Sequence, residues 1–117
     1  VLPGSSKSTR LETRVCGSDI NPYLAGAACI ASGLYGIENK LELKEDRITG
    51  NGYAVTDAVT LPRNLLEATE KMMGSEIARS LFGNAFVDHF GNSRLWEWRE
   101  FQKSVSDWEL KRYFEII

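Results

Sequence analysis

Apolar residues recur at helical spacing along the second half of the chain. One set repeats every three or four residues, and five of its six members are apolar: Phe86, Phe90, Arg94, Trp98, Phe101 and Val105. This spacing predicts an amphipathic helix over roughly residues 85–104 whose apolar face is directed toward a core. Gly91 lies near the middle of this helix and weakens its intrinsic propensity.

Capping residues predict shorter helices on both sides of it. Asn64 with Glu67 has the form of a capping box, and Gly74 can end the helix that begins there. Ser75 can start a second helix that ends at Gly83. Another capping-box pair, Ser106 and Glu109, predicts a last helix through about Phe114. Residues 64–117 are therefore interpreted as a helical tail.

A further helix is predicted over residues 21–37, from Pro22 to about Tyr35. Asn21 can cap the free backbone N–H groups, and Pro22 is well tolerated at the first helical position. The helix is crowded with alanine and glycine, which favour close approach of another backbone. We therefore expect it to be buried.

The remaining segments show less periodicity. Residues 38–63 form a polar connector with a turn signal at Asn51-Gly52. In residues 1–20, charged Arg10, Glu12 and Arg14 alternate with less polar neighbours, which is the period of a strand. The expected fold class is therefore mainly α, with a short β-strand or strand pair near the N-terminus.

Composition narrows the class of protein. The chain has 117 residues, 43% hydrophobic and 26% charged, which is typical of one soluble globular domain. A net charge of −2 argues against a nucleic-acid partner, so we interpret the three tryptophans as packing residues.

We find neither a membrane-spanning stretch nor a signal peptide. Cys16 and Cys29 fit no metal-ligand spacing and read as reduced thiols of a cytoplasmic protein. The chain begins at Val1 rather than Met, which suggests a piece of a longer polypeptide.

The N-terminal segment holds the one convergent set of charged residues. Lys7, Arg10 and Arg14 surround the single carboxylate of Glu12. Arginine suits bidentate contacts with phosphate or carboxylate, and a carboxylate can bind Mg²⁺ together with substrate phosphates. These groups suit phosphoryl transfer. Spacing alone leaves open a simpler interpretation, which is also the more common one: exposed ion pairs on a solvated face.

Several motifs resemble the glutamine synthetase family. The run Lys7-Ser8-Thr9-Arg10-Leu11-Glu12-Thr13-Arg14 is similar to that family's "K-x-x-R-[IL]-E-x-R" segment. It is followed by Asn21-Pro22-Tyr23-Leu24-Ala25, which is similar to the family's "NPYLA" helix start. The resemblance continues through Gly33–Lys40, Leu61–Ala68 and Trp98–Phe114, and so covers essentially the whole chain.

The resemblance implies roles for the charged residues. Glu12 falls where the family has a carboxylate ligand of a Mg²⁺ or Mn²⁺ ion. Arg14 falls where an arginine contacts glutamate or its phosphorylated intermediate, so the resemblance implies a catalytic and substrate-binding role for it. Arg10 and Lys7 fall where basic residues hold ATP. The implied reaction forms γ-glutamyl phosphate from glutamate and ATP, and ammonia or another amine then displaces phosphate.

The resemblance also implies what lies outside residues 1–117. The remaining metal ligands, the rest of an α+β catalytic domain and the contacts with neighbouring subunits are expected upstream, so we expect this chain alone to be inactive. The loop at Tyr53 lacks the proline-rich pattern of adenylylated members. This loop and the run Glu97–Phe101 are closer to γ-glutamylpolyamine synthetases, which suggests an amine larger than ammonia. The alternative is a noncatalytic helical interaction module that retains the family scaffold.

Overall fold

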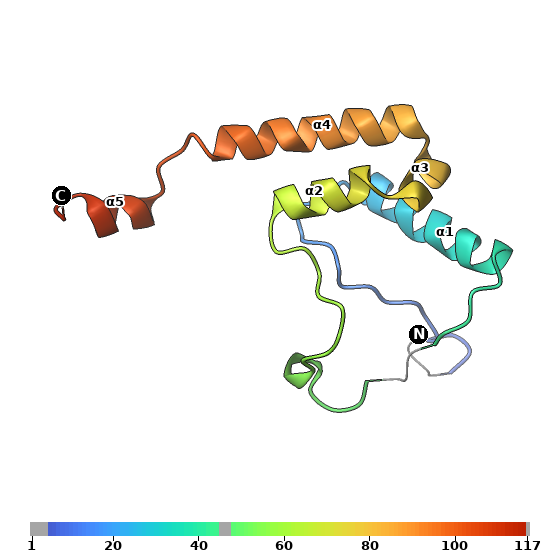
Figure 1. Ribbon diagram of the computed structural model, residues 1–117. Coiled ribbons are helices and arrows are strands. Elements are labelled where there is room, and N and C mark those ends of the chain that lie inside the picture. The colour runs from blue at the N-terminus through green and yellow to red at the C-terminus, as the bar shows by residue number, and fades with distance from the viewer. Residues whose placement is uncertain (1–4, 45–47, 117) are drawn as a thin grey trace. The chain divides into compact units, whose positions relative to one another are not determined.

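The computed structural model describes residues 5–44 and 48–116, which fall into two compact units. The first unit comprises Val1–Lys44 and the second Glu45–Ile117. The elements in chain order are α1 (Pro22–Glu38), the 3₁₀ turn η1 (Gly52–Ala54), α2 (Leu65–Met73), α3 (Glu76–Phe82), α4 (Asn84–Phe101) and α5 (Asp107–Tyr113) (Figure 1). The prediction of a mainly α chain is therefore confirmed.

The predicted N-terminal strand is wrong. Over the described residues no strand or sheet is present, and Arg10 has only an isolated bridge. A strand requires a partner whose backbone N–H and C=O groups face its own, and side-chain alternation does not supply one. The backbone from Leu11 to Val15 consequently carries no regular secondary structure and is exposed to solvent.

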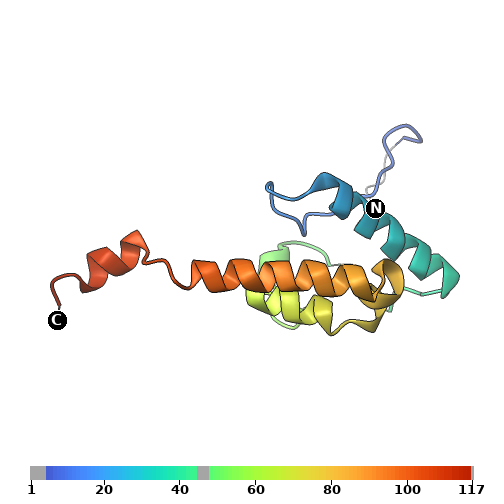
Figure 2. The same ribbon diagram turned by 90° about the horizontal axis from the view of Figure 1, so that it is seen from above.

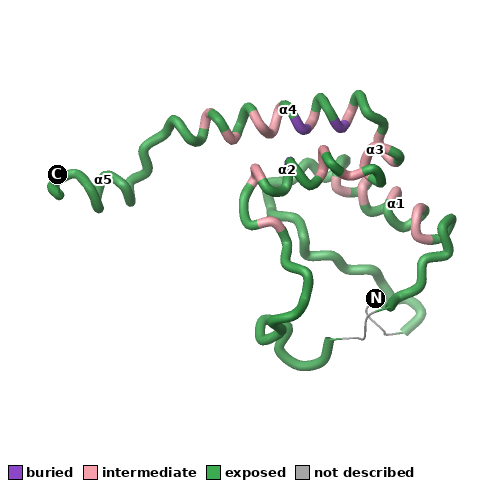
Figure 3. The backbone as a smooth tube through the Cα atoms, viewed as in Figure 1, coloured by how far each residue is buried: buried purple, intermediate pink, exposed green. Residues whose placement is uncertain are grey.

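Helix α1 begins where its capping residues predict. The Asn21 Oδ1 atom accepts hydrogen bonds from the backbone N–H groups of Tyr23 at 3.0 Å and Leu24 at 3.3 Å. The helix continues to Glu38, three residues beyond the predicted end at Tyr35. The expected burial is not found: no residue of α1 is buried, and the helix is coloured as exposed or intermediate throughout Figure 3. Among the described residues of its own unit, 5–44, α1 has no second helix or sheet against which to pack.

The predicted connector contains the turn expected at Asn51-Gly52, which lies in the second unit. Asn51 Oδ1 accepts a hydrogen bond from the Tyr53 N–H at 3.1 Å and thereby caps η1. Gly50 has a φ of +83°, a backbone conformation that residues other than glycine rarely adopt. Tyr53 is fully exposed.

Helices α2 and α3 also begin and end at the predicted residues. Asn64 Oδ1 accepts from the Glu67 N–H at 2.9 Å, while the Glu67 carboxylate accepts from the Arg63 N–H at 3.0 Å. Gly74 is the C-cap of α2. Ser75 caps α3 through the Ala78 N–H at 3.1 Å, and Gly83, with a φ of +79°, ends it.

The core of the second unit lies between α2 and α4, which pack side by side (Figures 1 and 2). Val87 is completely buried there, and Thr69 and Gly91 are also buried. The predicted stripe on α4 contributes stacked rings: Phe86 and Phe90 have centroids 5.6 Å apart, and Phe82 lies 5.8 Å from Phe86. Helix α3 completes the unit by packing on both helices.

Helix α5 is built from local interactions. Ser106 and Glu109 form the predicted capping box. The ring of Trp108 meets that of Tyr113 edge-on, with centroids 5.9 Å apart. Among the described residues, α5 packs against no other helix. None of the described helices is long and apolar enough to cross a bilayer.

Candidate active-site segment

The Glu12 carboxylate is held between two arginine side chains. Its Oε1 atom lies 2.6 Å from Arg14 Nη2 and accepts a hydrogen bond from Arg14 Nε at 2.8 Å. Its Oε2 atom lies 3.3 Å from Arg10 Nη2. The three alternating side chains therefore meet, as their period of two predicts, even though the backbone forms no strand.

Arg14 determines the ionisation of Glu12. The hydrogen bond from Arg14, and next its positive charge, lower the pKa of the Glu12 carboxyl below its ordinary value. Slight desolvation opposes this shift, and the hydrogen bond from Arg10 adds to it. Glu12 is consequently a carboxylate at neutral pH, which is the form that coordinates a divalent cation.

The cluster is accessible to ligands. The Glu12 side chain is 31% exposed, and those of Arg10 and Arg14 are 60% and 89% exposed. Ion pairs this exposed contribute little to stability, so their rearrangement around a ligand costs little. A cation or an anion from solution can therefore reach the carboxylate or the guanidinium groups.

The donor set fits a divalent metal only in part. A carboxylate oxygen is a hard ligand that Mg²⁺ and Mn²⁺ accept. Within residues 5–44 and 48–116, however, no three histidine, cysteine or acidic residues come together as a possible metal site. Glu12 can thus supply one ligand, and a complete metal site requires further groups.

Lys7 lies apart from the ion pairs of this cluster. It is in a turn held by hydrogen bonds from the N–H groups of Ser8, at 2.8 Å, and Thr9, at 3.1 Å, to the Ser5 carbonyl. In the described part of the chain, no ion pair includes Lys7. The structure thus brings Arg10, Glu12 and Arg14 together. Lys7, three residues before Arg10 in the sequence, is exposed and takes no part in these ion pairs.

An apolar groove associates the same segment with α1, which the charge pattern did not predict. Leu11 lines it together with residues of one α1 face: Cys29, Ile30, Gly33, Leu34 and Ile37. Its volume is about 330 Å³. Because neighbouring residues of an extended chain project to opposite sides, Leu11 can contact α1 while Glu12 stays in solvent. The apolar residues Leu11 and Val15 alternate with the charged ones, and this alternation could have indicated an apolar contact on the side of the segment opposite Glu12.

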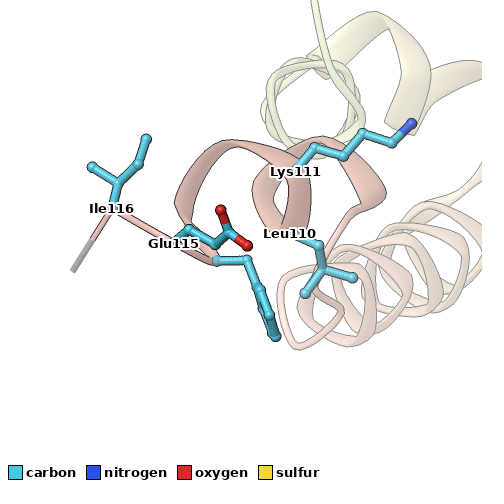
Figure 4. Close-up of a pocket in the computed structure, with 5 residues that line it drawn as sticks. Leu110, Lys111, Glu115 and Ile116 are labelled. Atoms are coloured by element: carbon cyan, nitrogen blue, oxygen red, sulfur yellow. The ribbon is translucent and has the colours of Figure 1, made fainter.

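The second unit has an open hollow at the end of α5. It is lined by Leu110, Lys111, Phe114, Glu115 and Ile116 (Figure 4). These residues belong to one helix and the few positions after it, and they include a single cation and a single carboxylate. Their side chains fan out from the helix rather than converge on one point, so this hollow lacks the geometry of a catalytic site.

Comparison with known proteins identifies the family. The profile described as "Glutamine synthetase, catalytic domain" matches residues 1–113. The chain therefore belongs to the glutamine synthetase catalytic-domain family, and the resemblance of its motifs to that family is confirmed. No solved structure matches the chain significantly.

The curated relatives include enzymes that join glutamate to different amines. The chain is 52% identical over 114 residues to the type-1 glutamine synthetase 2 of Dictyostelium discoideum, covering 95% of this chain and 22% of that protein. It is 43% identical over 118 residues to a glutamate–isopropylamine ligase of Pseudomonas sp, covering 99% and 26%. It is 44% identical over 112 residues to a γ-glutamylethanolamide synthetase of Streptomyces coelicolor, covering 96% and 24%. The chain thus spans about a quarter of the length of these relatives.

Proposed function

We propose that this chain contributes part of the active site of an ATP-dependent glutamate–amine ligase. The observation that carries the proposal is the exposed, ionised Glu12 carboxylate held between Arg10 and Arg14. It lies in a chain that matches the catalytic domain of a ligase family over residues 1–113. An isolated exposed ion pair would carry no functional meaning, but the same triad inside this family's motif does.

The acidic residue would bind the metal ion, and the basic residues would bind the negatively charged substrates. Glu12 would hold one Mg²⁺ or Mn²⁺ ion, which supplies charge neutralisation for phosphoryl transfer when bound. The side chains of Arg10 and Arg14 are 60% and 89% exposed, so both can turn from Glu12 toward a substrate. Arg14 would then bind the glutamate carboxylate or its phosphorylated form, and Arg10 with Lys7 would bind the phosphates of ATP.

The proposed reaction has two steps. The γ-carboxylate oxygen of glutamate attacks the terminal phosphorus of ATP, which gives γ-glutamyl phosphate and ADP. The amine nitrogen then attacks the carbonyl carbon of γ-glutamyl phosphate (Cδ of the glutamate), phosphate leaves with the C–O bond electrons, and the amine loses a proton. The arginine side chains stabilise the negative charge on the transferred phosphoryl group.

We further propose that residues 1–117 are inactive by themselves. A single carboxylate ligand does not complete a metal site, and the described residues offer no other cluster. The other groups would come from the rest of the catalytic domain and from neighbouring subunits. An assay of γ-glutamyl transfer by the purified 117-residue chain tests this directly, and turnover above the buffer rate would refute it.

The amine substrate is proposed to be larger than ammonia. Relatives that match along almost the whole chain are named for isopropylamine and ethanolamide, and another is a glutamate–methylamine ligase. The test compares ammonia with alkylamines, ethanolamine and polyamines as substrates of the enzyme that contains this chain. A strong preference for ammonia would contradict the proposal.

The decisive experiment changes Glu12 in that longer enzyme. We expect Glu12→Gln to reduce ATP-dependent amide formation by roughly 100-fold or more, because a neutral amide is a weak ligand for Mg²⁺. Glu42→Gln is the matched control, since Glu42 is an exposed carboxylate in the connector that forms none of the ion pairs described above. Equal activity of the two variants would refute the role of Glu12.

A noncatalytic interaction module remains the second candidate. It is favoured by the absence of buried residues in α1 and by the exposed aromatic residues Trp108 and Phe114. The two candidates differ in ligand binding. A ligase should lose Mg²⁺-dependent binding of an ATP analogue on Glu12→Gln, whereas a module should show no such binding in either form.

A further inference from the structure

Arg94 is the one charged residue of the apolar stripe on α4, and it lines a cavity between α2 and α4. The α2 residues of the cavity are Leu65, Ala68, Thr69 and Met72, and the α4 residues are Phe90, Gly91 and Arg94. The cavity has a volume of about 210 Å³. Arg94 is half-buried, and a cation that loses part of its hydration is stabilised by an anionic partner.

Arg94 has no carboxylate partner among the described residues. Its Nε atom donates to Ser93 Oγ at 3.3 Å, and its guanidinium lies over the Phe90 ring, 5.4 Å from the ring centroid. Arg79 of α3 is different, since its Nη1 atom lies 2.9 Å from Asp88 Oδ1. Both side chains are half-buried, so the difference lies in charge pairing rather than in exposure.

The cavity can hold one small apolar group beside this cation. Apolar protein cavities of about 150 Å³ accommodate a benzene molecule, so a space of this size fits a single ring or a short branched alkyl group. Thr69 lies at the cavity, but its hydroxyl already donates to the Leu65 carbonyl at 2.6 Å. The guanidinium of Arg94 is therefore the strong donor that remains for a ligand.

We propose that the space between α2 and α4 binds a small carboxylate with a single-ring or branched apolar body. The apolar body lies between Leu65, Met72 and Phe90, and the carboxylate pairs with the Arg94 guanidinium. Guanidinium geometry matches a carboxylate in a bidentate manner. This site is built from residues of the second unit alone, and Glu12 belongs to the first, so the proposal does not rest on the proposed ligase function.

The test uses phenylacetate as the probe and the full 117-residue chain labelled with ¹⁵N. We expect saturable shifts of the amide signals of Leu65–Met72 and Phe90–Arg94. Phenylacetamide has the same size without the charge, and we expect it to bind about tenfold or more weakly, because the bond to Arg94 is then no longer charge-assisted. Equal affinity for the two compounds, or shifts that do not saturate, overturns the proposal.

Variants separate the two parts of the site. Arg94→Gln should weaken phenylacetate binding by about tenfold or more, while Arg99→Gln, an exposed arginine on the same helix, should leave it unchanged. Ala68→Leu should abolish binding by filling the cavity. Circular dichroism tests whether each variant keeps its helices. The comparison of phenylacetate with phenylacetamide uses the unchanged chain, so it remains valid even if a variant unfolds. Loss of binding in Arg99→Gln to the same extent as in Arg94→Gln also overturns the proposal.

Discussion

Met73 packs directly onto Gly91, at the point where the end of α2 meets the middle of α4. A Cβ atom at Gly91 would lie 2.5 Å from Met73 Cγ and 2.6 Å from its Sδ, closer than real side chains approach. Gly91 therefore allows a contact that alanine would obstruct. The glycine lowers the helix propensity of α4 but provides the surface on which α2 packs.

We expect Gly91→Ala to destabilise the second unit by about 1 kcal/mol. Overpacking costs about 1–3 kcal/mol, and the gain in helix propensity returns up to about 1 kcal/mol. Urea denaturation followed by circular dichroism measures the change. Gly33→Ala is the control, because nothing lies within 4 Å of a Cβ at that helical position. A Gly91→Ala variant as stable as the original chain would contradict the contact. Gly91→Ala should cost less stability when it is combined with Met73→Ala, because the atoms that obstruct the new Cβ are then absent.

The starts of α1, α2, α3 and α5 could be predicted because N-terminal caps are local. Asn21, Asn64, Ser75 and Ser106 each accept hydrogen bonds from backbone N–H groups two or three residues ahead. Such contacts depend on the neighbouring sequence and need no tertiary structure. The convergence of Arg10 and Arg14 on Glu12 was predictable for the same reason, since alternation sets the direction of side chains.

The errors arose where a distant partner was required. The strand predicted around Arg10–Val15 needs a paired backbone, and the burial predicted for α1 needs a covering surface. Neither is provided within the described residues of the first unit. The contact of Met73 with Gly91 is also non-local, so the sequence indicated only that Gly91 weakens its helix. The cavity beside Arg94 depends on that same packing of α2 on α4.

Arg79 joins the three helices of the second unit, and its loss should be costly. Its Nε atom donates to the Met73 carbonyl at 3.0 Å, and its Nη1 atom contacts Asn84 Oδ1 at 3.2 Å and Asp88 Oδ1 at 2.9 Å. Arg79→Met keeps the apolar stem but removes these bonds, and we expect a loss of about 1–2 kcal/mol in the free energy of unfolding.

The matched control for Arg79 is the exposed pair of Lys103 and Glu100, 2.6 Å apart. Lys103→Met should change the free energy of unfolding by no more than about 0.5 kcal/mol, as is usual for exposed pairs. Thermal unfolding of both variants gives the comparison. If the two substitutions cost the same, Arg79 does not join the helices as described.

The capping box of α5 should make this helix sensitive to pH. The Glu109 carboxylate accepts from the Ser106 N–H at 2.8 Å, and this hydrogen bond lowers the pKa of Glu109. Because the pKa is lowered by folding, the stabilisation is present at neutral pH and is lost as the pH falls through the lowered pKa. NMR secondary shifts of residues 107–113 should therefore decrease in acid. Ser106→Ala removes the side-chain cap, which costs the helix about 1 kcal/mol, so the secondary shifts should be smaller already at neutral pH. Unchanged shifts in this variant would contradict the cap.

The pKa of Glu12 provides a test of its arginine partners that does not require catalysis. The hydrogen bond and the charge of Arg14 lower it most, and the Arg10 contact contributes less. Arg14→Gln should therefore raise the pKa of Glu12 toward its ordinary value by more than Arg10→Gln does, as measured by NMR titration of the side-chain carboxyl carbon. The ion pairs should persist at neutral pH and be lost as the pH falls through the lowered pKa. A larger effect of Arg10→Gln than of Arg14→Gln would contradict the geometry that positions this carboxylate.

The same carbon signal reports on metal binding. Mg²⁺ should shift the signal of the Glu12 carboxyl carbon because the ion competes with Arg14 for Oε1. The carboxyl carbon of Glu42, an exposed residue outside the cluster, is the control and should not shift; equal shifts of the two signals would contradict specific binding at Glu12.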